Sequence, residues 1–376
     1  MKINFLMAGG LGITGGVRCI CEHASRLRDR GHQVTIVLSR PKSGPEFAPR
    51  THVVRPAAIS FYVRSALAGL ALFANRIPAG YWRILTPLSA DLGSFRQLVP
   101  DADISVATAY QTAWPTYLCK KGVGFFFMQH FEELFAKPGP TELFERLHCR
   151  TTYLLPMYKV ANSMWLQAKL KKEMGIDVDV VNNGVDSSEF KPWPVPKDPA
   201  RPRIVTFGKP ISWKGFQDAA AAMQIVRTKH PQVEWVVFGY RPDLPPDNPM
   251  APYKFVGALL GDNLAKLYSS ADVVLCPSWY ESFPLPPLEA MACATAVVTT
   301  RPGTEDYATD RVNSLVVPAR DTQAMSSAVI ELIEDMRLRQ RLAESGYATA
   351  KRMTWERATA SFEAALFKAV ATSGEG

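Results

Sequence analysis

The residues PSWYESFPLPPLEAMACATAVVTT, at positions 277–300, decide the fold of this chain. An apolar run at 271–276 precedes them, and a second apolar run at 296–300 ends them. Both runs are short and rich in β-branched residues, which is typical of buried parallel strands. Pro286 and Pro287 lie between the runs at the start of a predicted helix, where proline gives up no needed hydrogen bond. The stretch therefore predicts a strand–helix–strand unit of an open parallel sheet.

Two carboxylates in this stretch are candidate ligand-binding groups. We expect Glu281 on the loop after the first strand, and Glu289 in the first or second turn of the helix. Ligands of open α/β sheets bind outside the carboxyl ends of the strands, and a helix N-terminus suits a phosphate. A sugar nucleotide carries both a diphosphate and hydroxyls, so it matches this set. The alternative is that Glu281 is a solvated loop residue and Glu289 stabilises the start of the helix.

Length and composition indicate a globular protein of two or three domains. The chain has 376 residues, 47% of them hydrophobic, and no run of the roughly 18 apolar residues that span a bilayer. The first residues lack the layout of a cleavable signal peptide. The six cysteines are scattered without zinc-site spacing, so we expect free thiols in a reducing cytoplasm. The net charge of +8 favours anionic partners, but the basic residues are dispersed and no nucleic-acid motif is present.

The first forty residues predict a β-α-β unit with a glycine-rich turn. Strands are expected at 2–7 and 34–38, with a helix at 17–29. The turn contains Gly10-x-Gly12-x-x-Gly15, which matches the dinucleotide fingerprint. The acid expected at the end of the second strand is replaced by Ser39-Arg40, and an arginine there suits NADP. An NADP-dependent oxidoreductase is therefore the second hypothesis, beside a tight turn with no ligand.

The second half of the chain restarts the α/β pattern after a proline-rich linker at 192–202. A predicted strand at 203–208 ends in Gly208-Lys209, and Lys214-Gly215 precedes a predicted helix at 216–229. Two cations beside a glycine-rich strand end suit a diphosphate leaving group. The alternative is that both are solvated loop lysines.

These motifs resemble those of the retaining glycosyltransferases of family 4, which have the GT-B fold. The central signature is matched by Pro277-Ser278, Glu281, 283–286 and 289–292, and it is supported by Gly208-Lys209, Lys214-Gly215 and the hinge-like 183–192. Ala294 and Ala296 replace the family's usual Gly and Pro, Ser282 and Pro284 replace loop glycines, and Lys209 replaces an Arg. The resemblance covers nearly the whole chain but is absent at 40–100. Residues 129–132 are also similar to a stretch of rhamnosyltransferase-like members.

The resemblance implies a fold, a domain plan and a set of site residues. The fold is α/β GT-B, with two Rossmann-like parallel-sheet domains facing a cleft and a last helix that crosses back to the first domain. The first domain, 1–185 with helix 354–372, would bind the acceptor, and the second, 186–353, would bind the nucleotide sugar. Catalytic roles are implied for Glu281, His130 and Lys214. The implied donor-binding residues are Gly15, Gly16, Gly208, Lys209, Lys214, Val256, Glu281, Ser282, Phe283, Pro284, Leu285, Pro286 and Glu289. The implied acceptor-binding residues are Tyr110, Gln129 and Glu132.

The implied reaction moves a sugar from a nucleotide-diphosphate donor to a glycan or lipid-linked acceptor, with retention of configuration, in cell-surface polysaccharide synthesis. No metal and no cofactor besides the nucleotide-sugar co-substrate are expected. Residues 57–85 combine apolar and basic residues, which suits either a helix packed on the sheet or contact with an anionic membrane. We therefore expect a cytoplasmic protein, peripheral at the inner face of the plasma membrane. A non-catalytic sugar-nucleotide-binding relative and a hydrolysing epimerase remain as further alternatives.

Overall fold

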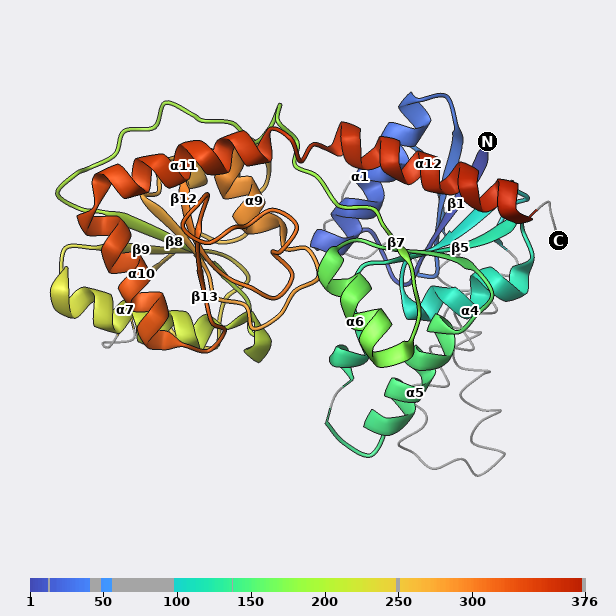
Figure 1. Ribbon diagram of the computed structural model, residues 1–376, viewed down its shortest axis with the longest axis horizontal. Coiled ribbons are helices and arrows are strands. Elements are labelled where there is room, and N and C mark those ends of the chain that lie inside the picture. Colours follow the sequence, from blue (N-terminus) through green and yellow to red (C-terminus); the bar gives the residue numbers. More distant parts are fainter. Residues whose placement is uncertain (13, 41–48, 56–97, 137, 248–250, 374–376) are drawn as a thin grey trace. The chain divides into compact units, whose positions relative to one another are not determined.

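The computed structural model describes residues 1–12, 14–40, 49–55, 98–136, 138–247 and 251–373. These divide into two compact units, which Figure 1 labels by element. The first unit comprises 1–162, 166–181 and the residues from 358 onward, and the second comprises 163–165 and 182–357. The segment 57–85, for which membrane contact was considered, lies outside the described residues. Among the described residues, no helix is both long and apolar enough to cross a membrane.

The first unit is a seven-stranded parallel sheet in the order β3-β2-β1-β4-β5-β6-β7. Its strands are β1 (Lys2–Met7), β2 (Gln33–Leu38), β3 (His52–Val54), β4 (Ile104–Ala107), β5 (Val123–Met128), β6 (Tyr158–Ala161) and β7 (Asp179–Val180). Its helices are α1 (Gly15–Asp29), α4 (Tyr110–Cys119), α5 (Glu142–Tyr153), α6 (Met164–Met174, whose first two residues belong to the second unit) and the short η1 (Glu132–Phe135).

Helix α12 (Trp355–Ser373) begins in the second unit and continues into the first, as expected for the last helix. Its apolar residues Phe362, Leu366 and Ala369 are buried in the core of the first unit, together with Phe5 and Phe127. Figure 1 shows α12 on the same side of that sheet as α1. The first sheet therefore buries one face against helices from opposite ends of the sequence.

The second unit is a six-stranded parallel sheet in the order β10-β9-β8-β11-β12-β13. Its strands are β8 (Arg203–Gly208), β9 (Glu234–Gly239), β10 (Lys254–Phe255), β11 (Val273–Cys276), β12 (Ala296–Thr300) and β13 (Leu315–Val317). Its helices are η2 (Ser212–Lys214), α7 (Phe216–Lys229), α8 (Gly261–Ser270), α9 (Leu285–Ala292), α10 (Thr322–Glu334) and α11 (Met336–Ala350).

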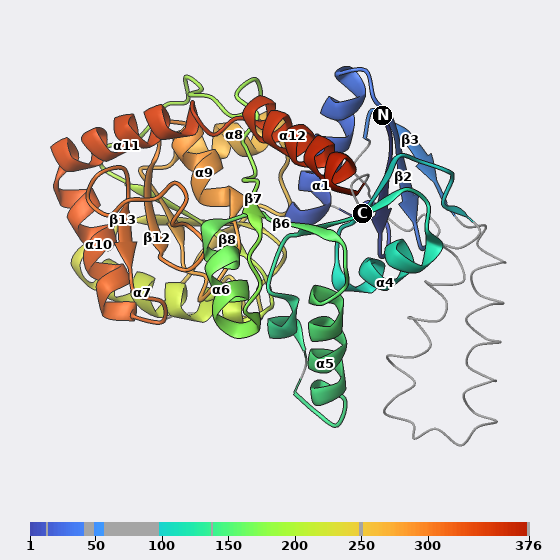
Figure 2. The same cartoon turned by 45° about the vertical axis from the view of Figure 1, so that its right-hand side comes forward.

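Helices cover both faces of the second sheet. Figure 1 shows α7 and α10 on one face and α9 and α11 on the other, and Figure 2 shows α8 beside α9. Strands β8, β11 and β12 are neighbours, so the loops that follow their carboxyl ends lie at one edge of the sheet. These loops carry the motif residues from 209 to 215 and from 277 to 284. The predicted fold class, two Rossmann-like parallel-sheet units, is thus confirmed.

One helix of the first unit was not predicted from the sequence. Tyr110, which the resemblance implies as an acceptor-binding residue, begins this ten-residue helix, α4. Pro115 lies inside this helix, where proline usually breaks the hydrogen-bond ladder. Helix α5 was not predicted either.

The turn after α9 contains a strained alanine. Ala294 follows the helix C-cap and has φ 54°, in the left-handed region that favours glycine. Its N–H donates to Met291 O at 3.0 Å, so the turn closes despite the Cβ. The chain therefore keeps this turn at an energetic cost of roughly 1 kcal/mol.

We predict that Ala294→Gly raises the free energy of unfolding of the second unit by about 1 kcal/mol, which is roughly 2–4 °C in Tm. The measurement is thermal or denaturant unfolding of the full chain. Ala290→Gly, inside the same helix, is the matched control and should lower stability, because glycine weakens a helix interior. A fall in Tm for Ala294→Gly would contradict the strain argument.

Candidate active site

The centre of the candidate site in the second unit is an ion pair between two predicted site residues. Lys214 ends η2, and Glu281 lies on the loop after β11. The Lys214 Nζ and Glu281 Oε1 atoms are 2.5 Å apart, and the two side chains are only 15% and 14% exposed. The sequence predicted both residues but not their contact. The ammonium is thus fixed beside a carboxylate at the carboxyl edge of the sheet.

Two glycines allow backbones to approach closely on either side of this pair. Gly215 has φ +68°, and a Cβ at this position would lie 2.1 Å from the carbonyl oxygen of Pro277. Gly303 has φ +91°, and its Cβ would lie 2.4 Å from the carbonyl oxygen of Glu281. Both positions exclude a side chain for steric and conformational reasons. The Lys-Gly motif is therefore what brings Lys214 against the β11 loop.

Further hydrogen bonds orient Glu281. Ser278 Oγ donates to Glu281 Oε1 at 2.8 Å, and the Glu281 N–H donates to Pro302 O at 3.1 Å. Thr300 Oγ1 donates to Ser278 O at 2.5 Å, which joins β12 to the same loop. Lys214 and Ser278 thus hold the carboxylate, and the loop after β12 holds the Glu281 backbone.

Glu289 lies in the second turn of α9, as predicted, and is buried. The buried hydroxyl of Tyr268, on α8, donates to Glu289 Oε2 at 3.2 Å. Sequence reasoning missed Tyr268 because it precedes Glu289 by 21 residues and carries no charge. Its hydrogen bond gives the buried carboxylate a neutral partner.

The segment from Ser282 to Pro286 joins the two glutamates. Ser282, Phe283 and Leu285 are buried, and Tyr307 fixes the turn by donating its hydroxyl hydrogen to Pro284 O at 2.7 Å. Pro284 and Pro286 have no N–H, so backbone donors for a ligand come only from the other residues of this segment. In this segment, the backbone N–H groups that remain as candidate donors are those of Ser282, Phe283 and Leu285.

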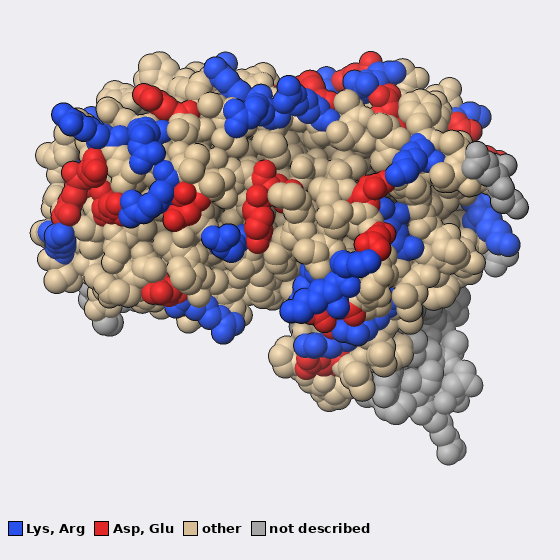
Figure 3. Space-filling model, viewed as in Figure 1, with Lys and Arg blue, Asp and Glu red and all other residues tan. Residues whose placement is uncertain are grey.

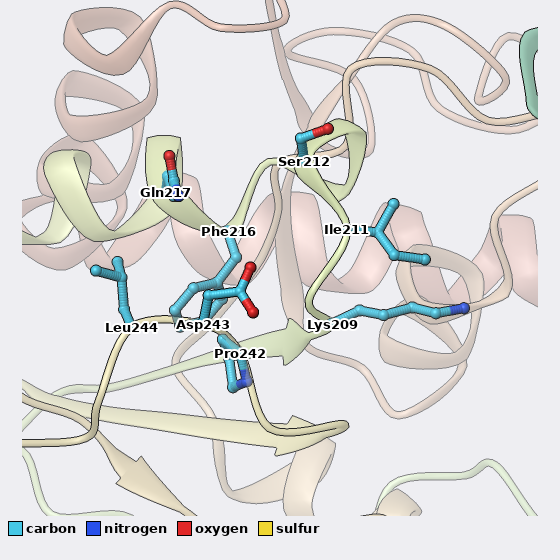
Figure 4. Close-up of a pocket in the computed structure, with 8 residues that line it drawn as sticks. All are labelled: Lys209, Ile211, Ser212, Phe216, Gln217, Pro242, Asp243 and Leu244. Carbon is cyan, nitrogen blue, oxygen red and sulfur yellow. The ribbon is translucent and has the colours of Figure 1, made fainter. Parts of the chain in front are cut away.

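Lys209 lies at the carboxyl end of β8 beside a small pocket. Its lining residues, drawn in Figure 4, are Lys209, Ile211, Ser212, Phe216, Gln217, Pro242, Asp243 and Leu244. Figure 4 shows the Lys209 side chain extending along the loop, away from Gln217 and Leu244. Burial and the nearby Lys214 ammonium lower the pKa of Lys209. The positive charges of the two lysines therefore repel each other, and a bound anion would offset this repulsion.

Two other predicted donor-binding residues, Gly208 and Val256, are constrained by contacts within the sheet. A Cβ on Gly208 would lie 2.7 Å from Val237 Cγ1 and 2.9 Å from Tyr240 O, so the end of β8 has no space for a side chain. Val256 follows β10, and its N–H donates to Val237 O at 3.0 Å. The Val256 amide is therefore used within the sheet.

In the first unit, Gly15 and Gly16 form the first turn of α1, and Gly16 lies close to Gln129. A Cβ on Gly16 would lie 3.4 Å from Gln129 Oε1. The Gln129 amide nitrogen donates to Thr108 O at 3.2 Å, while Oε1 is buried and has no hydrogen-bond partner among the described residues. His130 follows β5, is buried, and its ring centroid lies 4.4 Å from that of Phe135. Gly16 and Gln129 are therefore brought together in this unit.

Glu132 and Tyr110 are also neighbours, but in a role that the sequence did not predict. Glu132 Oε2 accepts the backbone N–H of Tyr110 at 2.6 Å, so the carboxyl group caps the N-terminus of α4. The Tyr110 ring lies 5.4 Å from that of His148. Burial raises the pKa of Glu132 to about 8, although the Tyr110 hydrogen bond opposes this shift.

Positive and negative side chains are mixed on the surface of the described residues, and some of them form ion pairs. Figure 3 shows Lys and Arg interspersed with Asp and Glu on the face that it draws. On α5 and α6 the pairs include Arg146–Glu142 at 2.8 Å and Lys169–Glu173 at 2.9 Å. The described residues contain no group of three or more His, Cys, Asp or Glu that could hold a metal ion.

Comparison with known proteins assigns the family. Residues 13–189 match the family model described as Glycosyltransferase Family 4, and residues 201–335 match the one described as Glycosyl transferases group 1. Both halves of the chain therefore match glycosyltransferase families. Neither match favours the oxidoreductase alternative based on Gly10–Gly15.

Relatives and solved structures are consistent with this family. The O-antigen biosynthesis protein RfbC of Myxococcus xanthus is 26% identical over 263 residues, which cover 69% of this chain and 20% of that protein. The matches span between a fifth and about half of the length of the first curated relatives. Sucrose-phosphate synthase from Thermosynechococcus elongatus has a TM-score of 0.79 at 17% identity, over 99% of both chains. Anabaena HepE, in complex with UDP-glucose, has a TM-score of 0.69 at 16% identity, over 98% of this chain and all of that one. The shared fold is GT-B.

We predict that adding a side chain at Gly215 destabilises the protein. Gly215→Ala should lower the free energy of unfolding of the second unit by roughly 3 kcal/mol or more, because Pro277 O occupies the space of the Cβ. Gly261→Ala is the matched control: its φ is +61°, but its Cβ would meet only Glu189 Oε1, at an ordinary 3.8 Å. The control should cost only about 1–2 kcal/mol. Equal losses in denaturant unfolding would contradict the close-approach argument.

Glu132 should make stability depend on pH. Its pKa in the folded protein, about 8, exceeds the ordinary value near 4.5, so between these values the folded state holds a proton that the unfolded chain has lost. The free energy of unfolding should therefore fall as pH rises from 5 to 8.

Glu132→Gln should remove that contribution, because glutamine stays neutral and can still accept the Tyr110 N–H. The measurement is urea unfolding of wild type and variant at several pH values. Glu173→Gln is the control and should leave the slope unchanged, since the Lys169 hydrogen bond lowers the pKa of Glu173. An unchanged slope in Glu132→Gln would contradict the assignment.

Proposed function

We propose that the protein is a retaining glycosyltransferase that moves a sugar from a nucleotide-diphosphate donor to a glycan or lipid-linked acceptor. The observation that carries the proposal is the Lys214–Glu281 pair, held by Gly215 and Gly303 at the carboxyl edge of the sheet in the unit that matches Glycosyl transferases group 1. HepE, which has the same fold, was solved with UDP-glucose, and this supports a nucleotide-sugar donor.

The donor roles follow from charge and position. Lys209 and Lys214 neutralise the diphosphate and stabilise the leaving nucleotide. Glu289 accepts bonds from the ribose hydroxyls, and Glu281 accepts bonds from hydroxyls of the transferred sugar. Helix α9 begins at Leu285, so its N-terminal amides add partial positive charge beside the phosphates.

The acceptor roles belong to the first unit. His130 contacts the transferred sugar, while Tyr110 and Gln129 contact the acceptor. The unused, buried Oε1 of Gln129, next to Gly16, supports a ligand role because buried polar atoms normally have a partner. Glu132 acts on this site through α4, whose first amide it caps.

The chemistry needs no added base or metal in this proposal. The donor phosphate takes the acceptor's proton as the acceptor oxygen attacks on the face that the phosphate leaves, so configuration is retained. The cations supplied by the chain offset the charge that develops on the leaving nucleotide.

The biological role in the proposal is synthesis of a cell-surface polysaccharide. RfbC is described as an O-antigen biosynthesis protein, which supports this assignment. The net charge of +8 suits anionic donors and contact with an anionic membrane surface in the cytoplasm.

A thermal-shift screen with UDP, GDP, dTDP, ADP and their sugars tests the proposal. One nucleotide at 100 times its Kd should stabilise the wild type by about 2.7 kcal/mol. Lys214→Ala and Glu289→Ala should lose the shift. Lys229→Ala, which breaks an exposed Lys–Glu pair of 2.7 Å elsewhere in the unit, should keep it.

NMR of the product formed with that donor then tests retention, since the anomeric configuration of the donor should persist. Stabilisation by NADP and by none of the nucleotides would instead support the oxidoreductase. Binding without turnover in the presence of glycan acceptors would support a non-catalytic relative.

A further inference from the structure

The loops of the candidate donor site contact each other through two adjacent pairs of side chains. Trp213 immediately precedes Lys214 on η2, and Tyr280 immediately precedes Glu281 after β11. The rings of Trp213 and Tyr280 are stacked, with centroids 5.2 Å apart and an angle of 14° between their planes. One residue further along each loop, Lys214 and Glu281 form their ion pair. An aromatic contact and a charged contact therefore lie next to each other.

The same tryptophan also contacts the lysine. Lys214 Nζ lies 4.3 Å from the centroid of the Trp213 ring, within the range of a cation–π interaction. The ammonium is thus bounded by an aromatic ring and by the Glu281 carboxylate. A lysine side chain is long and normally samples many rotamers, and these contacts restrict it before a ligand arrives.

Backbone contacts hold the two loops together independently of the rings. The Trp279 N–H donates to Trp213 O at 2.8 Å, and Gly215 packs against Pro277 O. The indole nitrogen of Trp279 donates to Asp218, at the start of α7, at 2.5 Å. Removing one ring should therefore leave the fold in place while freeing the lysine.

We propose that the Trp213–Tyr280 stack is a positioning element that holds Lys214 in place for the donor diphosphate. This inference rests on the proposed function, because it assumes that Lys214 binds the diphosphate. The two rings act through Lys214 and need not touch the donor. Neither residue belongs to the motifs from which the site was predicted, so the motifs alone do not predict this stack.

The test measures the Kd of the nucleoside diphosphate that stabilises wild type, among UDP, GDP, dTDP and ADP, by isothermal titration calorimetry. Trp213→Leu and Tyr280→Leu should each weaken binding about three- to tenfold, which matches the usual worth of an aromatic pair. Trp213→Phe and Tyr280→Phe keep a ring and should stay within about twofold of wild type. Trp213→Leu and Tyr280→Leu remove the stack from opposite sides, so either variant tests the inference if the other fails to fold.

A double-mutant cycle separates positioning from general destabilisation. In a Lys214→Met background, Trp213→Leu should change the Kd less than about twofold, because no cation is left to position. Tyr347→Leu is the matched control: Lys351 Nζ lies 4.3 Å from the Tyr347 ring on α11, the same separation as at Trp213. This variant should leave the Kd unchanged.

An unchanged Kd in both folded Leu variants would overturn the inference. An equal loss of affinity in the Lys214→Met background would also overturn it. If the wild type binds none of the four nucleotides, the result contradicts the proposed function and also the inference that rests on it. If wild type binds one and Lys214→Met does not weaken it, the role of the lysine fails while the nucleotide assignment stands.

Discussion

The contact on which the candidate site depends is the approach of the Gly215 backbone to the carbonyl oxygen of Pro277, where no Cβ fits. Peptide groups of two different loops can pack this closely only if one of them carries glycine. The approach places η2 against the loop after β11 and so puts Lys214 within reach of Glu281. Gly303 allows a second close approach of this kind, against the Glu281 backbone on the other side of the pair. The charge pair is thus a consequence of backbone packing rather than its cause.

Much of the fold could be predicted because local sequence and tertiary structure agree there. Strands 203–208 and 296–300 and helix 216–229 were predicted with the bounds that β8, β12 and α7 have. Their runs are apolar, β-branched or helix-favouring, and glycine or proline ends them. Helix α4 was missed because its N-terminus is capped by Glu132, 22 residues away, while Pro115 in its middle argues against a helix. A capping residue that is distant in the sequence cannot be recognised from the residues next to the helix.

The candidate site was predictable as a set of residue types but not as a geometry. Family motifs identified Lys214, Glu281 and Glu289, because each lies within a short run of residues that can be recognised in the sequence. The 2.5 Å contact of Lys214 with Glu281 joins positions 67 apart, and the Tyr268 bond to Glu289 crosses between two helices. Such pairings depend on strand order, which spacing does not encode. For the same reason the sequence did not predict that the Glu132 carboxyl group caps helix α4.

Helix α12 has a consequence for the order in which the protein can be built. A ribosome delivers residues 1–181 first, yet the core of the first unit also needs Phe362, Leu366 and Ala369, which emerge after the whole second unit. Domains usually fold as they emerge, the N-terminal one first. Here α1 can cover part of this sheet face early, but the part that packs on α12 stays exposed until residues 362–369 have emerged, after the second unit. The N-terminal half therefore needs chaperone protection most during synthesis. In a chain truncated before α12, part of the apolar face of the first sheet would stay exposed.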